Sequence, residues 1–149
     1  MVWTSPPAAT MVAEFNTAFD RDIPNEQMTA DDFGVGDEPM LFGLIAEEFK
    51  ELQEARAAGD LDGVIDALQD LKYVIYGYEL RMGISSEDHF AEVHAANMRK
   101  LGPDGKPIYR DDGKILKPEG WTGPDHAKVR ATVEQTGGIF MEAGTSTVH

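Results

Sequence analysis

The chain has 149 residues and a formal net charge of −14, from 27 acidic and 13 basic side chains. This length predicts one domain, residues 1–149, and the negative charge argues against binding to nucleic acids or to anionic membrane surfaces. Because the sequence contains no cysteine, disulfides and thiolate ligands are excluded, and a bound metal would need oxygen or imidazole ligands.

Targeting signals are not evident in the sequence. No run approaches the roughly 20 apolar residues that cross a bilayer, so we expect no membrane span. Residues 1–10 have neither a basic segment nor an apolar segment, so we expect no secretory signal. The lack of cysteine fits a reducing compartment, and the expected location is the cytoplasm.

The first expected helix covers residues 8–19, directly after two prolines. Its apolar side chains recur on one face at helical spacing, which is typical of an amphipathic helix. Residues 25–38 are polar, include two glycines and five acids, and predict a loop. The predicted apolar face of this helix consists of Met11, Phe15, Ala18 and Phe19.

Two long helices are expected next, over residues 40–58 and residues 61–82. Gly59 is the residue type that commonly ends a helix, and Gly83 is placed to end the second one in the same way. Asp60 is placed to cap the second helix. The apolar stripes are Leu41, Leu44, Ile45, Phe49 and Leu52 in the first helix, and Val64, Ile65, Leu68, Leu71, Val74, Ile75 and Tyr78 in the second.

A fourth helix is predicted from Ser85 or Ser86 to about Lys100, with two acids in its first turn where the helix dipole favours them. Its expected inward face consists of Phe90, Val93 and Asn97.

The C-terminal part of the sequence changes to turns. A small hairpin is predicted within residues 102–122, around Ile108-Tyr109 and Ile115-Leu116. A short helix is predicted over residues 125–135, and residues 136–149 predict a mobile tail. Because short links favour antiparallel neighbours, the expected fold class is an all-α antiparallel bundle with a C-terminal loop or small hairpin.

The helix predicted over residues 40–58 carries carboxylates next to its apolar stripe. Glu47, Glu51 and Glu54 share one face, because side chains three and four residues apart are neighbours on a helix. Glu48 continues the spacing of the apolar stripe itself, so the period assigns it to the core. An unpaired carboxylate in a core costs several kcal/mol, so Glu48 should form a pair, change its pKa or bind a cation.

The following helix repeats this feature. Asp66, Asp70 and Tyr73 lie on one face, although aspartate is unfavourable inside a helix. If the two helices pack antiparallel, Asp70 faces the glutamates of the preceding helix. These carboxylates would repel one another unless a divalent cation lies among them, and oxygen ligands suit Mg²⁺ or Mn²⁺. The alternative is a solvated acidic face with ordinary surface ion pairs.

Residues with complementary chemistry follow the acidic helices. Lysines concentrate there, as a phosphate chain requires, and Asn97 lies three residues before Lys100. Trp121 either fills the core of the loop or stacks on a base. The alternatives are a capping or core hydrogen bond for Asn97 and simple solvent exposure for each lysine. The lysines of this region are Lys100, Lys106, Lys114 and Lys117.

Four sequence blocks, in order, resemble the MazG-like all-α nucleotide pyrophosphohydrolases, and the last two resemble their dUTPase-like, often phage-encoded branch. The resemblance covers roughly residues 40–122, with residues 40–101 as the expected catalytic helical core and residues 102–122 as the nucleotide-side loop. The blocks are Glu47-Glu48-x-x-Glu51, Asp66-Ala-Leu-Gln-Asp70-Leu-Lys-Tyr73-Val-Ile-Tyr76-Gly77, His94-Ala-Ala-Asn97-Met-Arg-Lys100 and Asp112-Gly-Lys114-x-x-Lys117-Pro-x-Gly120-Trp121.

One position departs from the pattern of these enzymes. Their second acidic pair is commonly Glu-x-x-Asp; the aspartate matches Asp70, but the glutamate position holds Ala67. Either Asp66 substitutes for that glutamate or the ligand is missing, so one bound metal is better supported than two.

The resemblance implies Mg²⁺- or Mn²⁺-dependent hydrolysis of a nucleoside triphosphate to a monophosphate and pyrophosphate, for nucleotide-pool control. It implies a deoxynucleotide such as dUTP or dGTP, and a homodimer or homotetramer in which two chains often build one site. The implied catalytic residues are Glu47 and Glu48, where Glu47 is a further ligand or the base that activates water. The implied metal ligands are Glu47, Glu48, Glu51 and Asp70, with Asp66 as the substitute; the implied substrate-binding residues are Tyr73, Asn97, Lys100, Lys114, Lys117 and Trp121.

Two other functions fit the sequence. The first is that of a relative that acts on a different phosphoanhydride, such as phosphoribosyl-ATP, against which only the block from Lys114 to Trp121 argues. A non-catalytic acidic helical protein that binds a divalent cation or a partner is the remaining alternative.

Overall fold

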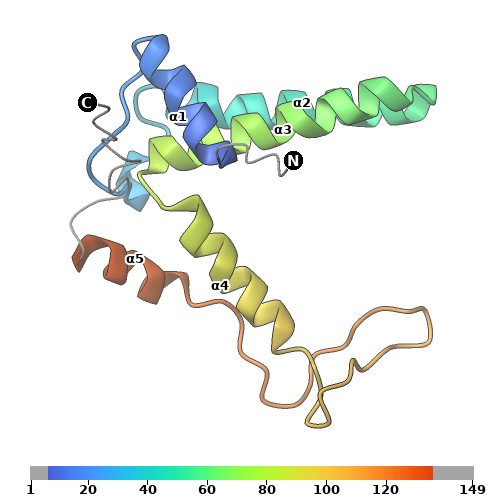
Figure 1. The fold of residues 1–149 in the computed structure, drawn as a ribbon. Coiled ribbons are helices and arrows are strands. Elements are labelled where there is room, and N and C mark those ends of the chain that lie inside the picture. Colours follow the sequence, from blue (N-terminus) through green and yellow to red (C-terminus); the bar gives the residue numbers. More distant parts are fainter. Residues whose placement is uncertain (1–6, 136–149) are drawn as a thin grey trace, which may run out of the picture. The chain divides into compact units, whose positions relative to one another are not determined.

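The computed structural model describes residues 7–135 and divides them into two compact units, residues 7–86 and residues 87–135. The predicted mobile tail, residues 136–149, lies outside the described residues. The described part is helical, which confirms the all-α fold class; the single domain stays a prediction. The elements are α1 (Ala8–Ala18), a short 3-10 helix η1 (Ala30–Asp32), α2 (Glu38–Ala58), α3 (Leu61–Met82), α4 (Ser86–Met98) and α5 (His126–Gln135) (Figure 1).

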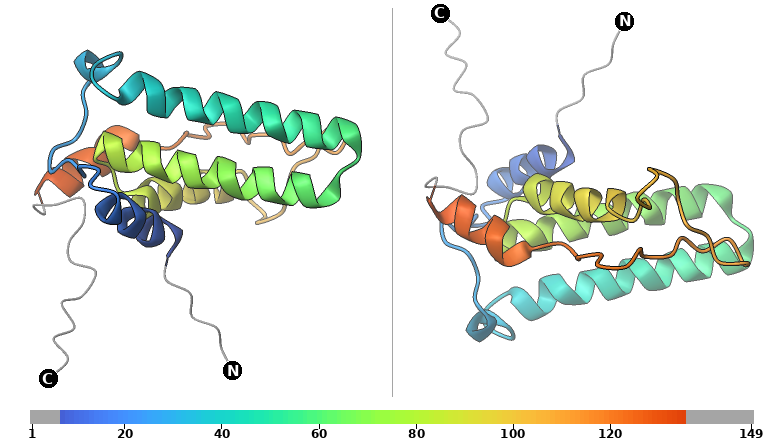
Figure 2. Two further views of the ribbon diagram at one scale, coloured as in Figure 1. Left: turned by 90° about the horizontal axis from the view of Figure 1, so that it is seen from above. Right: turned by 90° about the horizontal axis from the view of Figure 1, so that it is seen from below.

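In the first unit, α2 and α3 lie side by side as an antiparallel hairpin (Figure 2). Gly59 ends α2 in a left-handed conformation, with φ of 69°, and Gly83 ends α3 with φ of 68°. A side chain at either position would be strained, because non-glycine residues rarely adopt positive φ. The carboxylate of Asp60 accepts a hydrogen bond from the backbone N–H of Gly63 at 2.9 Å. These contacts confirm the three predicted helix ends.

The N-terminal helix α1 packs on α3, but with a different face from the one predicted. Val12 and Asn16 are its buried residues, whereas Phe19 is 65% exposed. Val12 lies beside Gly77 of α3, where a Cβ atom would be in ordinary van der Waals contact, 4.0 Å from Cγ1 of Val12. The predicted face was therefore wrong in part, because α1 turns the stripe of Val12 and Asn16 toward α3.

Glu38 connects the start of α2 to α3 and to the preceding loop through hydrogen bonds. Its carboxylate accepts hydrogen bonds from the hydroxyl of Tyr78 at 2.6 Å and from the backbone N–H of Gly34 at 2.7 Å. These bonds, that of Tyr78 first, lower the pKa of Glu38, while burial and the bond to Glu38 raise the pKa of Tyr78 to about 12. The hairpin is therefore held at its open end by a polar contact that accompanies the apolar packing.

In the second unit, α4 turns a face toward residues 121–126 that is shifted by one residue from the prediction. His89 and Ala96 are buried, whereas Phe90 is 75% exposed and Asn97 is exposed. The prediction that Phe90 and Asn97 face inward was wrong, because the chain segment that covers α4 lies over the adjacent stripe of the helix.

The loop between α4 and α5 contains two isolated antiparallel bridges, one between Leu101 and Pro107 and one between Tyr109 and Ile115. The backbone N–H of Leu116 donates to the carbonyl of Ile108 at 2.8 Å, so the predicted chain reversal is present. Within residues 7–135 neither bridge extends into a β-strand. None of the helices there has the length and hydropathy of a transmembrane segment.

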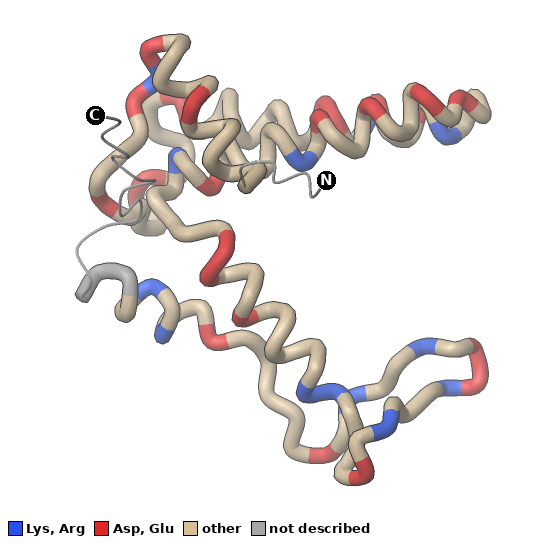
Figure 3. The backbone as a smooth tube through the Cα atoms, viewed as in Figure 1, with Lys and Arg blue, Asp and Glu red and all other residues tan. Residues whose placement is uncertain are grey.

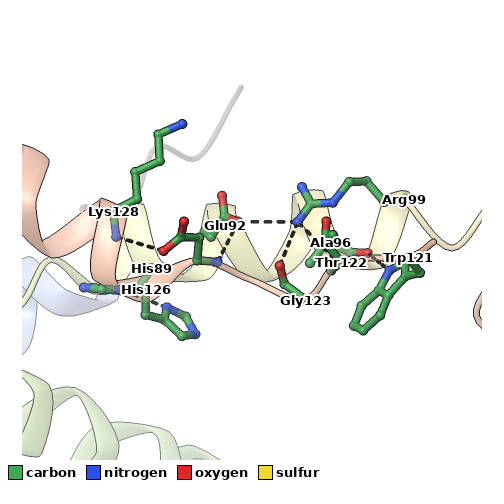
Figure 4. Close-up of polar contacts among 10 residues, drawn as sticks. His89, Glu92, Ala96, Arg99, Trp121, Thr122, Gly123, His126 and Lys128 are labelled. Atoms are coloured by element: carbon green, nitrogen blue, oxygen red, sulfur yellow. Dashed lines mark hydrogen bonds and ion pairs between the residues drawn. The ribbon is translucent and has the colours of Figure 1, made fainter.

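A pair of histidines joins α5 to α4 (Figure 4). The Nδ1 atoms of His89 and His126 lie 2.9 Å apart, so one ring must donate and the other must accept. Burial, and then the nearby His126, lower the pKa of His89 below its usual value of 6.5. The folded state therefore favours neutral His89.

This pair predicts a pH dependence of stability. Because the unfolded chain binds a proton at His89 more readily than the folded chain does, stability should fall as the pH drops below about 6.5. In imidazole proton NMR, His89 should titrate below that value in the wild type and closer to it in His126→Ala. The exposed His94 on the same helix provides the control, since His94→Ala should leave the titration of His89 unchanged. Titration of wild-type His89 at or above its ordinary value would contradict the prediction.

Candidate functional site

Glu48 on α2 is half-buried in the first unit. Its Oε2 atom is inaccessible to solvent and has no hydrogen-bond partner among the described residues. Burial raises the pKa of Glu48, and the charges of Glu51, Asp70, Glu47 and Asp66 raise it further, in that order. A carboxylate that is desolvated, unpartnered and surrounded by other negative charges is costly unless a cation or a proton compensates it.

The antiparallel hairpin accounts for this environment. Asp66 and Asp70 lie on α3, and both act electrostatically on Glu48 across the hairpin, as the antiparallel packing predicts. Unlike Glu48, four of the predicted ligands are exposed: Glu47, Glu51, Asp66 and Asp70. In residues 7–135, no group of three or more acidic or histidine side chains is arranged to hold a metal ion. The complete ligand set therefore stays a prediction.

Ala67 occupies the α3 position where the resemblance places a glutamate. It is only 4% exposed, so this position contributes packing within the unit and no carboxylate. Asp66 is exposed beside it and raises the pKa of Glu48 least among the four acids. Substitution of Asp66 for the missing glutamate stays a prediction.

The residues present fit one divalent cation better than a closed metal cage. Mg²⁺ commonly keeps several waters and uses one or two protein carboxylates together with substrate phosphates. The unpartnered oxygen of Glu48 is one such donor. The carboxylate of Asp70, whose charge raises the pKa of Glu48 from α3, is a candidate for the second.

Acidic and basic residues are segregated along the chain (Figure 3). Residues 1–86 contain 17 acidic and five basic side chains, whereas residues 99–117 contain six basic and three acidic ones. The first segment is suited to cations and the second to anions. The predicted phosphate-side lysines all lie in the second unit.

The phosphate-side residues contact one another within the second unit. The side-chain oxygen of Asn97 accepts a hydrogen bond from Nζ of Lys100 at 2.8 Å. The indole N–H of Trp121 donates to the carbonyl of Ala96 at 2.8 Å (Figure 4), and Nζ of Lys117 lies 4.4 Å from the indole ring centroid. These contacts bring together four of the predicted residues: Asn97, Lys100, Lys117 and Trp121. The sequence alone did not show that they would meet.

Two further predicted residues lie apart from this cluster. Lys114 is exposed in the loop, where its backbone N–H donates to the carboxylate of Asp112 at 3.2 Å. Tyr73 is 40% exposed in the first unit, and its ring meets that of Phe15 edge to face at 5.8 Å. Lys114 is thus placed by a local turn and Tyr73 by aromatic packing. The roles of both residues in substrate binding stay predictions.

Sequence reasoning missed the residues that hold the C-terminal segment on α4. Arg99 donates to the carbonyl of Gly123 at 3.2 Å, and the carboxylate of Glu92 accepts from the backbone N–H of Asp125 at 3.0 Å (Figure 4). The partners are 24 and 33 residues apart in the chain, so no periodicity indicates them.

Residues 12–97 match the family described as phosphoribosyl-ATP pyrophosphohydrolase, which is part of the MazG-like all-α superfamily. The match includes every predicted metal ligand and Asn97, and it ends before Lys100. No curated protein matches the chain.

Proposed function

Because the chain belongs to the phosphoribosyl-ATP pyrophosphohydrolase family, whose enzymes hydrolyse phosphoanhydride bonds, we propose that it cuts nucleoside triphosphates into a monophosphate and pyrophosphate with a divalent metal. The observation that carries this proposal is the buried, unpartnered oxygen of Glu48, whose pKa is raised by burial and by the charges of Glu51, Asp70, Glu47 and Asp66. Mg²⁺ or Mn²⁺ is the proposed cofactor, since the available donors are oxygens.

The metal-side roles belong to the α2–α3 hairpin. Glu48, Glu51 and Asp70 hold the metal, with Asp66 as a further candidate, and Glu47 is either another ligand or the base that accepts a proton from the attacking water. A bound metal would neutralise phosphate oxygens and lower the pKa of water. The exposed carboxylates remain open to water and substrate, whereas the buried oxygen of Glu48 is preorganised.

The phosphate-side roles belong to residues outside the hairpin. Asn97 and Lys100 bind the phosphate chain, and their mutual hydrogen bond keeps the ammonium group in one direction. Lys114 and Lys117 add positive charge, which stabilises charge that develops on the phosphates. Tyr73 lies near the nucleotide in this proposal.

The proposed substrate is a deoxynucleotide such as dUTP or dGTP, which assigns the enzyme to nucleotide-pool control and to the dUTPase-like branch. This proposal rests on the block from Lys114 to Trp121, which lies beyond the matched residues. The family match favours a second candidate, phosphoribosyl-ATP, because that compound is named in the family description.

A panel of nucleotides separates these candidates. Purified protein with Mg²⁺ or Mn²⁺ is incubated with each of the common ribo- and deoxynucleoside triphosphates and with phosphoribosyl-ATP, and products are separated by ion-exchange chromatography. We expect a monophosphate and pyrophosphate in equal amounts, fastest from dUTP or dGTP, and none in EDTA. Fastest turnover of phosphoribosyl-ATP would support the second candidate. If no substrate gives a product, the result would favour the alternative of a non-catalytic protein that binds a cation or a partner.

Exposed apolar side chains on the hairpin support a homodimer or homotetramer. On α3, Leu61, Ile65 and Leu68 are 71%, 49% and 42% exposed and recur at helical spacing, and Phe42 and Phe49 on α2 are more than half exposed. Exposed apolar side chains that recur at helical spacing are typical of an interface. Light scattering that gives the 16.4 kDa mass of one chain would contradict this part of the proposal.

A further inference from the structure

The orientation of Trp121 in the second unit is fixed by its surroundings. Its indole N–H donates to the carbonyl of Ala96 at 2.8 Å, and the next residues are held by Arg99, which donates to the carbonyls of Thr122 at 3.4 Å and Gly123 at 3.2 Å (Figure 4). The polar edge of the ring is therefore occupied by α4. The ring itself is half-buried.

Two ammonium groups gather on this ring. Nζ of Lys117 lies 4.4 Å from the ring centroid, and Nζ of Lys100 lies 5.6 Å from it. Both distances are within the range of cation–π attraction. Lys100 is held in addition by the side-chain oxygen of Asn97 at 2.8 Å. Within residues 7–135, neither lysine forms an ion pair with an acidic side chain.

This arrangement holds two like charges near one ring, with no counter-ion from the described residues. The indole attracts both, but it carries no net charge, so the positive charge stays available to an anion. The four further basic residues of residues 99–117 strengthen the positive potential of this segment. A flexible pair of lysines would lose side-chain entropy on binding an anion, and the ring reduces that loss by holding both groups in advance.

We propose that Trp121 is a positioning residue, which holds Lys100 and Lys117 as one binding site for a di- or triphosphate chain. Nζ of Lys117 lies over the ring at 4.4 Å from its centroid, where a stacked base would lie, so Trp121 acts through the lysines and not by base stacking. This inference rests on the proposed function, because it assigns the part of the substrate that the second unit binds.

Pyrophosphate binding tests the lysine pair without turnover. Trp3 and Trp121 are the two tryptophans of the sequence, so Trp3→Phe leaves Trp121 as the single tryptophan fluorophore. In EDTA, inorganic pyrophosphate should change the fluorescence of this protein in a saturable way. Lys117→Ala should raise the Kd of pyrophosphate about tenfold, whereas Lys128→Ala, which removes an exposed lysine of α5, should leave it unchanged. Equal weakening in both variants would overturn the inference, because only nonspecific attraction would remain.

Substitutions of Trp121 test the positioning role. By calorimetry, Trp121→Leu should raise the Kd of pyrophosphate about tenfold, and Trp121→Phe should be intermediate, because phenylalanine keeps a ring but loses the N–H donor. With a nucleoside triphosphate as substrate, Trp121→Leu should raise KM and leave kcat nearly unchanged, as expected when ground-state binding alone is lost. Wild-type binding in Trp121→Phe together with a lowered kcat would overturn the role, and Trp121→Phe decides the matter if Trp121→Leu does not fold.

The two proposals fail in different ways. If wild-type protein binds pyrophosphate through Lys117 but hydrolyses no nucleotide, the proposed function is wrong and the binding site stands. If nucleotides are hydrolysed while Lys117→Ala and Trp121→Leu bind pyrophosphate as tightly as the wild type, the inference is wrong and the proposed function stands.

Discussion

Glu48→Gln should abolish pyrophosphate release, lowering kcat/KM by about 10²-fold or more. Glutamine keeps the size of the side chain but removes the charge that a divalent cation needs at the buried oxygen of Glu48. Asp70→Asn should have a similar effect, since Asp70 is the proposed metal ligand on α3 and asparagine removes its negative charge. Release of pyrophosphate from the preferred nucleotide, measured with an enzyme-coupled assay, checks both variants.

A glutamate on the same helix provides the matched control. Glu54 is exposed and pairs with Lys50 at 3.6 Å, so Glu54→Gln should keep wild-type turnover. Far-UV circular dichroism should show equal helix content in all three variants. Full turnover in both Glu48→Gln and Asp70→Asn would show that the acidic face of the hairpin is not the metal site.

Leu80→Ala should reduce the free energy of unfolding by about 2–5 kcal/mol, a large share of the stability of a domain of this size. Leu80 is 1% exposed and is the large side chain that is most completely buried in the described part of the chain. Its truncation leaves a cavity close to the C-terminal end of α3. Urea denaturation followed by circular dichroism measures the effect.

Phe90 on α4 provides the comparison, because it is 75% exposed. Phe90→Ala should change the free energy of unfolding by roughly 0.5 kcal/mol or less, as is usual at exposed positions. Equal losses in the two variants would mean that the core does not lie where Leu80 is buried.

Helix ends followed from the sequence because the chemistry that forms them is local. Gly59, Asp60 and Gly83 act on backbone groups within a few residues of themselves, and the structure has helix ends at these three positions. The helix predicted over residues 40–58 begins at Glu38 in the structure, and the side chain of Glu38 accepts a hydrogen bond from Tyr78, which lies 40 residues further along the chain. A contact of that separation leaves no periodic signal.

Apolar periodicity predicted helices better than it predicted their buried faces. On α4 it favoured Phe90, yet His89 is buried because its partner His126 lies on α5, beyond a long loop. A small apolar residue such as Ala96 gives a weak signal, although it is among the most buried residues of the unit. Faces that are set by distant segments cannot be read from one helix alone.

The candidate site was predictable only where one residue broke a pattern. Glu48 interrupts the apolar stripe of α2, and the structure leaves its carboxylate partly buried without a partner. The gathering of Lys100 and Lys117 on Trp121 depends on how the loop returns to α4, which no local spacing indicates. Charges on two antiparallel helices can be aligned from sequence, whereas contacts made by a long loop cannot.

Binding of Mn²⁺ is the most direct measurement of the central claim, that carboxylates of α2 and α3 require a divalent cation. Electron paramagnetic resonance reports free Mn²⁺, so its signal falls when the ion binds to protein. We expect saturable binding by the wild type and by Glu54→Gln, and loss of that binding in Glu48→Gln. Equal Mn²⁺ binding by Glu48→Gln and the wild type would contradict the claim.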